Sequence, residues 1–268
     1  MNDRDYVHGY SAQEHQRLLD QGSTLAELLH VDTVFPPGTD ILEAGCGVGA
    51  QTVTVARKNA GAHIHSIDIS ASSLAAARAR VAAAGLANVT LLEADIFRLP
   101  FPGARFDHAL ICFVLEHLRD PLAALWHLKA MVKPGGTMTV IEGDHGSTYF
   151  HPQSADAMRA VQCLVDVQAS LGGDALIGRR LYPLLRDAGL RDVHVSPRMV
   201  YVDASRPQLV EGFTVKTFNA MVAGVREQAI ARGLIDAASF DAGMRGLQRT
   251  TEPDGTFCYT FFKAVATV

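Results

Sequence analysis

The sequence predicts an α/β fold, a doubly wound, mostly parallel sheet of seven strands with helical insertions that form a cap or lid. Two observations support this prediction. Segments typical of buried strands alternate with helical segments from residue 40 to about residue 142. The first strand also runs into a glycine-rich turn, DILEAGCGVG at residues 40–49, and a helical stretch follows it. Strand, glycine turn and helix form the start of a nucleotide-binding unit.

The expected strands are short apolar segments bounded by turn residues. They cover residues 40–43, 63–69, 89–94, 106–112, 137–142, 193–202 and 256–265. Helices are expected between the first five strands, at residues 50–59, 71–84 and 120–132. Ser70 is expected to cap the second of these helices, and Gly85 to end it.

The segment before the glycine turn predicts a helix at residues 11–30. Ser11 is its expected N-cap and Glu14 completes a capping box, while Pro36-Pro37-Gly38 stops the chain from continuing as a helix. Tyr10 lies on an aromatic leader ahead of this helix. We expect it either to fold over a bound cofactor as part of a lid or to anchor the leader to the domain surface.

The chain is expected to be a single domain over residues 1–268. Its core would be residues 38–145 with two C-terminal strands at 191–203 and 256–266, and the lid elements would be 1–30, 146–172 and 206–248. Helical patterns at 154–170, 175–188 and 206–248 fall in or near these insertions. Ligands of open α/β sheets bind beyond the carboxyl ends of the strands, so the insertions are expected to build a substrate chamber.

Composition narrows the range of partners. The 24 Lys and Arg residues against 28 Asp and Glu give a formal charge of -4, which argues against nucleic acid as a partner. The first residues lack a signal peptide's apolar core, and no apolar run reaches membrane-spanning length. The four cysteines lack the close spacing of a metal site. We therefore expect a cytoplasmic enzyme with no metal and no membrane partner, and the sequence leaves a homodimer open.

Three acidic residues distinguish the segment around the glycine turn from a simple dinucleotide-binding pattern. Asp68 ends the second expected strand, 19 residues after Gly49, where a carboxylate can bind ribose hydroxyls. Asp95 closes the third strand, where it can reach an exocyclic adenine amine. Glu43 precedes the glycines, and its charge would repel a pyrophosphate but attract a cation or an ammonium group.

Three further motifs are Phe106-Asp107, LEHLRDP after the fourth strand and LKAMVKPGG before the fifth. Together with the acidic residues and the glycine turn, they resemble the class I S-adenosylmethionine-dependent methyltransferases. The resemblance covers residues 38–145. It implies S-adenosyl-L-methionine as cofactor, S-adenosyl-L-homocysteine as product, and a seventh strand inserted antiparallel beside the fifth. It also implies the cofactor contacts Glu43, Gly45, Gly47 and Gly49 at the methionine part, Asp68 and Ile69 at the ribose and adenine, Asp95 and Ile96 at the adenine, and Cys112 and Phe113 beside the sulfonium.

Catalytic candidates are expected at the carboxyl end of the fifth strand. Glu142, Asp144 and His145 fall there, and a histidine held by a carboxylate can act as a general base. The alternative is a turn in which these groups satisfy backbone N–H donors. His117 is expected to be structural. A further set of side chains is expected to line an apolar pocket or to pack in the core: Tyr149, Phe150, His151, Phe213, Phe218, Met221 and Tyr259.

The expected function is methyl transfer to a small-molecule acceptor. By analogy, an aromatic secondary metabolite of phenol or indole type is the expected acceptor, with O-, N- and C-methylation all open. The alternative functions are an NAD(P)-dependent oxidoreductase and a non-catalytic cofactor-binding protein. A nucleic-acid methyltransferase is disfavoured by the charge and by Cys112-Phe113-Val114-Leu115, where such enzymes carry an Asn/Asp-Pro-Pro-aromatic motif.

Overall fold

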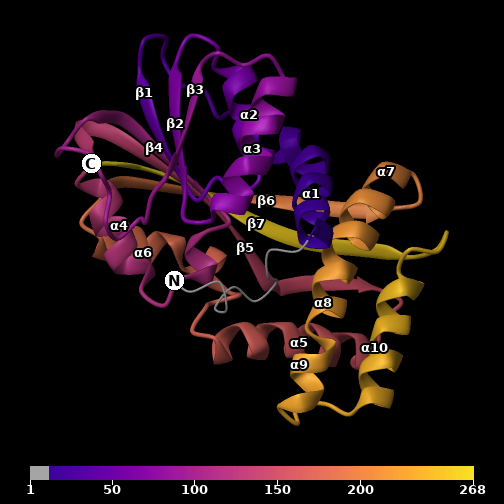
Figure 1. Ribbon diagram of the computed structural model, residues 1–268. Helices are drawn as coiled ribbons and strands as arrows, with labels where there is room; N and C mark the ends of the chain where they lie inside the picture. Colours follow the sequence, from indigo (N-terminus) through magenta and orange to yellow (C-terminus); the bar gives the residue numbers. More distant parts are fainter. Residues whose placement is uncertain (1–11) are drawn as a thin grey trace.

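The computed structural model describes residues 12–268 and contains the predicted seven-stranded sheet (Figure 1). The strand order is β3-β2-β1-β4-β5-β7-β6. The first five strands pair in parallel, and β7 runs antiparallel between β5 and β6, as the resemblance implies. The strands are β1 (Asp40–Ala44), β2 (His63–Asp68), β3 (Val89–Glu93), β4 (Phe106–Cys112), β5 (Val132–His151), β6 (Arg191–Asp203) and β7 (Thr256–Thr267). The expectations for Tyr10 and Ser11 lie outside the described residues.

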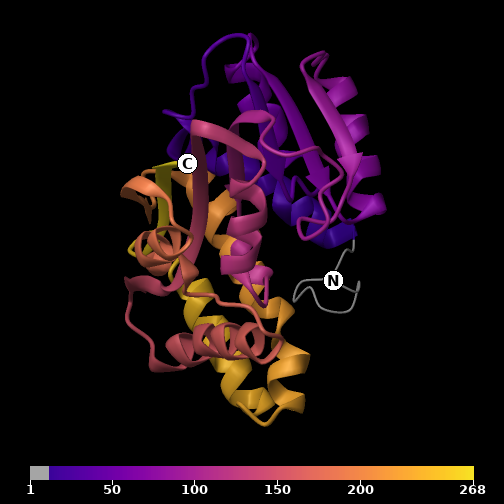
Figure 2. The same cartoon turned by 90° about the vertical axis from the view of Figure 1, so that its left-hand side faces the viewer.

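Helices cover both faces of the parallel part of the sheet (Figures 1 and 2). On one face, Leu125 of α4 (Pro121–Lys129) and Leu185 of α6 (Leu181–Asp187) share a buried core with Ala109 of β4. On the other face, Val55 of α2 (Ala50–Lys58) packs with Ile41 of β1. The sheet is therefore doubly wound, with α1 (Ala12–His30) and α3 (Ala71–Ala83) completing the helices before β3.

Local capping explains where the helices of this part begin. Ser70 accepts a hydrogen bond from the backbone N–H of Ser73 at the start of α3, as predicted. Asp120 does the same for α4 by accepting from Ala123, and Pro121 occupies the first helical position. These caps fix the helix starts next to the strand ends that form the site.

The prediction that the fifth strand ends at residue 142 is wrong, because β5 continues to His151. Beyond a register shift between Asp144 and Tyr149, the strand still pairs with β7 as far as His151 opposite Thr256. Pairing with β7 satisfies the backbone N–H and C=O groups of residues 149–151, and this pairing extends the strand beyond residue 142. Residues 142–146 consequently lie inside a strand, just beyond Ile141, the last residue of β5 that pairs with β4.

A helical layer packs against this extension of β5 and β7, at the bottom of Figure 1. The single helical segment expected at 206–248 is wrong as one unit: it is divided into α7 (Pro207–Leu209), a π-helix η3 (Val210–Asn219), α8 (Ala220–Gly224), α9 (Arg226–Ala231) and α10 (Ala237–Arg249). Helix α10 approaches α5 (Ala155–Ser170) closely, since a Cβ at Gly243 would lie 2.6 Å from the Asp156 carbonyl oxygen. Two short 3₁₀ turns complete the described chain, η1 (Leu115–His117) and η2 (Ile177–Arg180).

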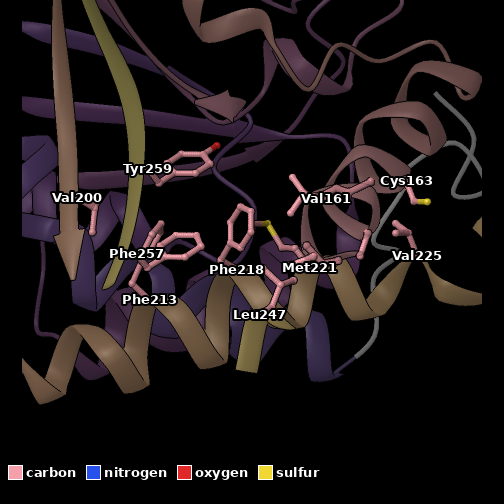
Figure 3. Close-up of a cluster of buried hydrophobic side chains, with 14 of the residues drawn as sticks. Val161, Cys163, Val200, Phe213, Phe218, Met221, Val225, Leu247, Phe257 and Tyr259 are labelled. Atoms are coloured by element: carbon pink, nitrogen blue, oxygen red, sulfur yellow. The ribbon is translucent and has the colours of Figure 1, made fainter. Parts of the chain in front are cut away.

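An aromatic core holds η3 against the extended strands (Figure 3). Phe213 and Phe218 of η3 and Phe257 and Tyr259 of β7 are almost fully buried, and the Phe218 and Phe257 ring centroids lie 4.8 Å apart. Burying one such ring stabilises the fold by roughly 1.5–3 kcal/mol. The aromatic core therefore fixes the position of η3 beside the residues that follow β4.

Within the described residues, no helix combines the length and the apolar character that crossing a bilayer requires. In the same part of the chain, no three His, Cys, Asp or Glu side chains gather in a way that could hold a metal ion.

Candidate active site

The glycine turn after β1 adopts the backbone conformation that its sequence requires. Gly45, Gly47 and Gly49 have φ values of 72°, 52° and 76°, which L side chains rarely adopt. The N–H groups of Gly45 and Cys46 donate to the Ile67 carbonyl at 2.8 and 3.0 Å, which pins the turn to β2. A Cβ at Gly45 would also lie 2.5 Å from a methyl carbon of Val114. The turn therefore packs closely and leads into α2, whose N-terminus suits a polar ligand group.

A cleft opens above this turn, along the carboxyl ends of β1, β2 and β4. It encloses about 1240 Å³ of space not filled by atoms, counting the solvent at its mouth. Of the predicted cofactor contacts in the described chain, all but Gly49 line it: Glu43, Gly45, Gly47, Asp68, Ile69, Asp95, Ile96, Cys112 and Phe113. The structure thus brings together residues that are up to 70 positions apart in the sequence. Helix α1 closes one side of the cleft with Glu14, Leu18 and Gln21.

The cleft is acidic. Four carboxylate side chains line it, from Glu14, Glu43, Asp68 and Asp95, and no Lys or Arg stands among its described lining residues. Glu14 is paired with Arg17 at 2.6 Å, so the acidic character comes from the other three. Burial raises the pKa of Glu43, whose Oε2 accepts a 2.6 Å hydrogen bond from the Ser66 hydroxyl. Burial also raises the pKa of Asp68. This charge pattern favours a cationic ligand and opposes a pyrophosphate.

Asp68 organises the glycine turn in this structure. Its Oδ2 accepts from the N–H of Gly47 at 2.7 Å and its Oδ1 from the N–H of Ser70 at 2.8 Å. The predicted contact with ribose hydroxyls uses the same carboxylate and stays a prediction. These bonds nevertheless explain why an acidic side chain at the end of β2 lies beside the turn after β1.

Apolar side chains line the opposite end of the cleft, beyond β2 and β3. Ile69 is 37% exposed and Phe97 is 36% exposed, although both are large and apolar. Asp95 holds the adjoining turn, because its Oδ1 accepts from the Phe97 N–H at 2.9 Å. Large apolar side chains exposed inside a concave site suit a flat ring such as a purine. Residue Phe97 was not among the sequence candidates.

A second cavity, which we call the inner chamber, adjoins the cleft and encloses about 450 Å³ of unfilled space. The two cavities share Leu18, Gln21, Phe113 and His117. Phe113 has a φ of 59°, a conformation that costs energy for a bulky residue, and its N–H donates to Ile141. The other lining residues are Arg17, Glu116, Gly143, His145, Phe213, Met221, Tyr259 and Phe261.

His145 is the one member of the predicted catalytic group that lines the inner chamber. Its Nδ1 forms a 2.7 Å hydrogen bond with the Tyr259 hydroxyl. Its Nε2 is buried, lies 4.0 Å from Oε2 of Glu116 and has no hydrogen-bond partner among the described residues. Burial lowers the pKa of His145 and raises that of Tyr259, so both side chains are neutral near pH 7.

Glu142 and Asp144 face the backbone instead. Oε1 of Glu142 accepts from the N–H groups of Val114 and Leu115 at 3.0 and 2.8 Å. Asp144 accepts two hydrogen bonds from Arg179, at 2.7 and 2.8 Å, and one from the Gly146 N–H. Neither carboxylate is among the described residues that line the cleft or the inner chamber. Their catalytic role stays a prediction, and these contacts support the alternative in which they hold the surrounding turns.

Glu116 is the functional candidate that the sequence analysis missed. It is 8% exposed, and its Oε2 accepts a 3.2 Å hydrogen bond from Gln168. Burial acts to raise the pKa of Glu116, but His117, His145, the hydrogen bond from Gln168 and the charge of Arg17 lower it overall. Burial and the nearby charge of Glu116 raise the pKa of Glu142 well above its usual range. Of the two buried carboxyl groups, Glu116 is therefore the one that ionises more readily.

The sequence held a weak signal for this site. Glu116 lies in LEHL, which reads as an ordinary helix start, and a turn residue's inward orientation depends on the surrounding fold. Phe213, Met221 and Tyr259, expected to line a pocket or to pack in the core, do line the inner chamber. Tyr149, from the same expected set, is 56% exposed and lies on the sheet surface.

Comparison with known proteins agrees with this geometry. A family model described as a methyltransferase domain matches residues 41–136, which hold β1 to β4 and the first residues of β5. A demethylmenaquinone methyltransferase from Listeria monocytogenes is 31% identical over 106 residues, covering 39% of this chain and 45% of the relative. The chain spans about half the length of the first curated relatives it matches.

Two solved structures share the fold along most of the chain. The (4+2)-cyclase SpnF superposes with a TM-score of 0.56 at 22% identity, covering 92% of this chain and 80% of SpnF. Phosphoethanolamine N-methyltransferase 2 from Haemonchus contortus, in complex with S-adenosyl-L-methionine, has a TM-score of 0.55 at 18% identity, covering 91% of this chain and 52% of that protein. At these identities the likeness concerns the fold alone.

Proposed function

We propose that this chain, whose residues 41–136 match a family model described as a methyltransferase domain, transfers the methyl group of S-adenosylmethionine to a small molecule. The observation that carries the proposal is the charge of the cleft. The carboxylates of Glu43, Asp68 and Asp95 line the cleft with no Lys or Arg among its described lining residues, which suits a sulfonium and an ammonium group. The apolar walls at Ile69 and Phe97 suit the adenine ring at the other end.

The residues present fit this cofactor. Glu43 and the glycine turn would hold the methionine part, Asp68 the ribose, and Ile69, Asp95 and Ile96 the adenine, with Cys112 and Phe113 toward the sulfonium. Bound there, the cofactor supplies a methyl carbon that bonds to the acceptor while the carbon–sulfur bond breaks and its electron pair stays on sulfur. The protein's contribution is to align the acceptor, to exclude water and to manage a proton.

The inner chamber is the proposed acceptor site. It adjoins the cleft at Phe113, and its aromatic side chains from η3 and β7 can bury an apolar or aromatic body. This supports an aromatic acceptor of phenol or indole type, which remains a proposal. His145 is the predicted side chain that meets the reacting group of the acceptor.

Two other functions make different predictions. An NAD(P)-dependent oxidoreductase must hold a pyrophosphate, and the carboxyl groups of Glu43 and Asp68 beside the glycine turn would repel it. A protein that binds the cofactor without methyl transfer is the second alternative. The cyclase SpnF shares this fold, so the fold alone does not decide the chemistry.

Calorimetric titration tests the cofactor. We expect S-adenosylhomocysteine to bind at least 10-fold tighter than NADH, and Asp68→Ala to weaken it by roughly 10-fold or more, because hydrogen bonds to a charged group contribute about 1.5–3 kcal/mol. Asp254→Ala, which removes an exposed carboxylate paired with Arg249, is the matched control and should change nothing. Tighter binding of NADH, or unchanged affinity after Asp68→Ala, would contradict the proposal.

A further inference from the structure

We infer that Glu116 and His145 bind the hydroxyl group of an alcohol or phenol in the inner chamber, with His145 donating to its oxygen and Glu116 accepting its proton. This inference rests on the proposed function, because it names the acceptor class of that site. It assigns roles to Glu116 and Tyr259 and changes the role predicted for His145.

The first support is the spacing of two facing atoms. His145 Nε2 and Glu116 Oε2 lie 4.0 Å apart, too far for a hydrogen bond with one another, and Nε2 has no partner among the described residues. An oxygen about 2.8 Å from both atoms would complete both hydrogen bonds, with an angle of about 90° at that oxygen. Both side chains line the chamber, and because Nε2 itself is covered, such an oxygen reaches it from the chamber once a neighbouring side chain moves aside.

The second support is the tautomer of His145, which Tyr259 determines. The hydroxyl of Tyr259 is buried, and in the part of the chain that the structure describes its side-chain hydrogen bond is the one to Nδ1 of His145. A buried hydroxyl left without an acceptor is costly, so Tyr259 donates to Nδ1. In a neutral imidazole the proton then lies on Nε2, which faces Glu116.

The pair consequently offers one donor and one acceptor to a ligand. Nε2–H of His145 donates, because its Nδ1 is bonded to Tyr259, and the carboxylate of Glu116, whose Oε2 already accepts from Gln168, accepts. A hydroxyl group supplies the matching acceptor and donor at a single oxygen. An ether or a ring carbon has no proton for Glu116, and an amine offers donors to both sides but a poor acceptor for Nε2–H. The arrangement therefore selects hydroxyl acceptors, and hence O-methylation.

This geometry also defines the proton's path. As the acceptor oxygen bonds to the methyl carbon, its proton passes to the carboxylate of Glu116, and the electron pair of the O–H bond remains on oxygen. Gln168 continues to donate to Glu116 throughout. His145 keeps its Nε2 proton and positions the oxygen, so the general-base role predicted for His145 passes to Glu116.

Ligands that share one ring test the inference without knowledge of the natural acceptor. Phenol, anisole, toluene and aniline are titrated by NMR against the protein, with and without S-adenosylhomocysteine. Phenol should bind at least about 10-fold tighter than toluene and anisole, the ratio expected for one hydrogen bond to a charged group. The separate titration of S-adenosylhomocysteine shows whether the proposed function itself fails.

Substitutions assign the effect to the two residues. E116Q should reduce the phenol-to-toluene ratio to about 3 or less, and H145F should remove it, whereas H145Q retains an N–H donor and should keep most of it. E227Q, at an exposed glutamate paired with Arg226, is the matched control. Thermal melting verifies folding of each variant, and H145F and H145Q remain decisive if E116Q does not fold. Equal binding of phenol and toluene, or aniline binding tighter than phenol, would overturn the inference.

Discussion

The cofactor cleft and the inner chamber lie side by side but are built in different ways. Most of the cleft comes from residues 43–118, where each lining residue lies at the end of a strand or in the turn or helix start that follows it. The chamber takes one to three residues from each of several distant elements, among them Arg17 in α1, Glu116 in η1, His145 in β5, Phe213 in η3 and Tyr259 in β7. Cofactor contacts are thus encoded locally, whereas acceptor contacts depend on tertiary structure.

The two regions also differ in how they treat charge. In the cleft, Asp68 and Asp95 bond to backbone N–H groups of nearby turns. In the chamber, the carboxyl group of Glu116 is buried near Arg17, His117, His145 and Gln168, where an unpaired charge would be costly. Substitutions in the chamber should therefore alter chemistry, and those in the cleft should alter cofactor affinity.

The largest effect is expected from Glu116→Gln, which should lower the rate of methyl transfer and leave cofactor affinity unchanged. With the best hydroxyl acceptor of a phenol panel, Glu116→Gln should lower the rate of methyl transfer by roughly 10²–10⁴-fold, the usual cost of losing a proton acceptor, with unchanged affinity for S-adenosylhomocysteine. Asp68→Ala should instead weaken cofactor binding, and a saturating concentration of cofactor should restore most of the rate of this variant. Mass spectrometry of the methylated product measures the rate. A Glu116→Gln rate within twofold of the parent would end the distinction between the two regions.

A smaller effect is expected from Gly143→Ala. A Cβ at Gly143 would overlap the hydroxyl of Tyr259, which must then move away from Nδ1 of His145. We expect phenol binding to weaken by roughly 10-fold, the value of one hydrogen bond to a buried partner, with no change in cofactor affinity. Gly224→Ala is the matched control, because a Cβ there meets no atom within 4 Å. Equal effects of the two substitutions would show that Tyr259 does not control the chamber.

The smallest effect is expected from Glu142→Gln. The amide oxygen can accept from Val114 and Leu115 as the carboxyl does, so rate should stay within about twofold, whereas Glu142→Leu should lose about 1–3 kcal/mol of stability. Burial raises the pKa of Glu142, so its ionisation destabilises the folded state as pH rises through that raised value. Glu142→Gln cannot ionise and should therefore gain stability relative to the parent at high pH. Melting curves across pH check this, and a large loss of rate would restore Glu142 as a catalytic residue.

Much of the fold could be predicted because its signals are local. The glycine turn, the acidic residue ending β2 and the caps at Ser70 and Asp120 each act within a few residues of the chain. The order of the last strands came from the family resemblance and is confirmed. Nothing in the residues around Glu142 marks the continuation of β5, because it depends on β7, more than 100 residues later.

The candidate site was predictable to the same extent. The cleft residues follow recognisable motifs, and the structure places nearly all of them together. His145 could be selected because it follows the strand expected at residues 137–142. Its partners Glu116 and Tyr259 are 29 residues before it and 114 residues after it. The tautomer of a histidine depends on such partners, so a sequence that suggests a base can fold into a donor.

The extended ribbon of β5 and β7 also bears on how such proteins diversify. The helical layer follows the register shift at Asp144, and it lies outside residues 41–136, the range that matches the family model, as do the chamber residues His145, Phe213 and Tyr259. Mutations there can accumulate without disturbing the glycine turn or the acidic strand ends. The acceptor chamber can thus change through substitutions on the ribbon and its helical layer while the cofactor contacts at the ends of β1 to β4 stay in place.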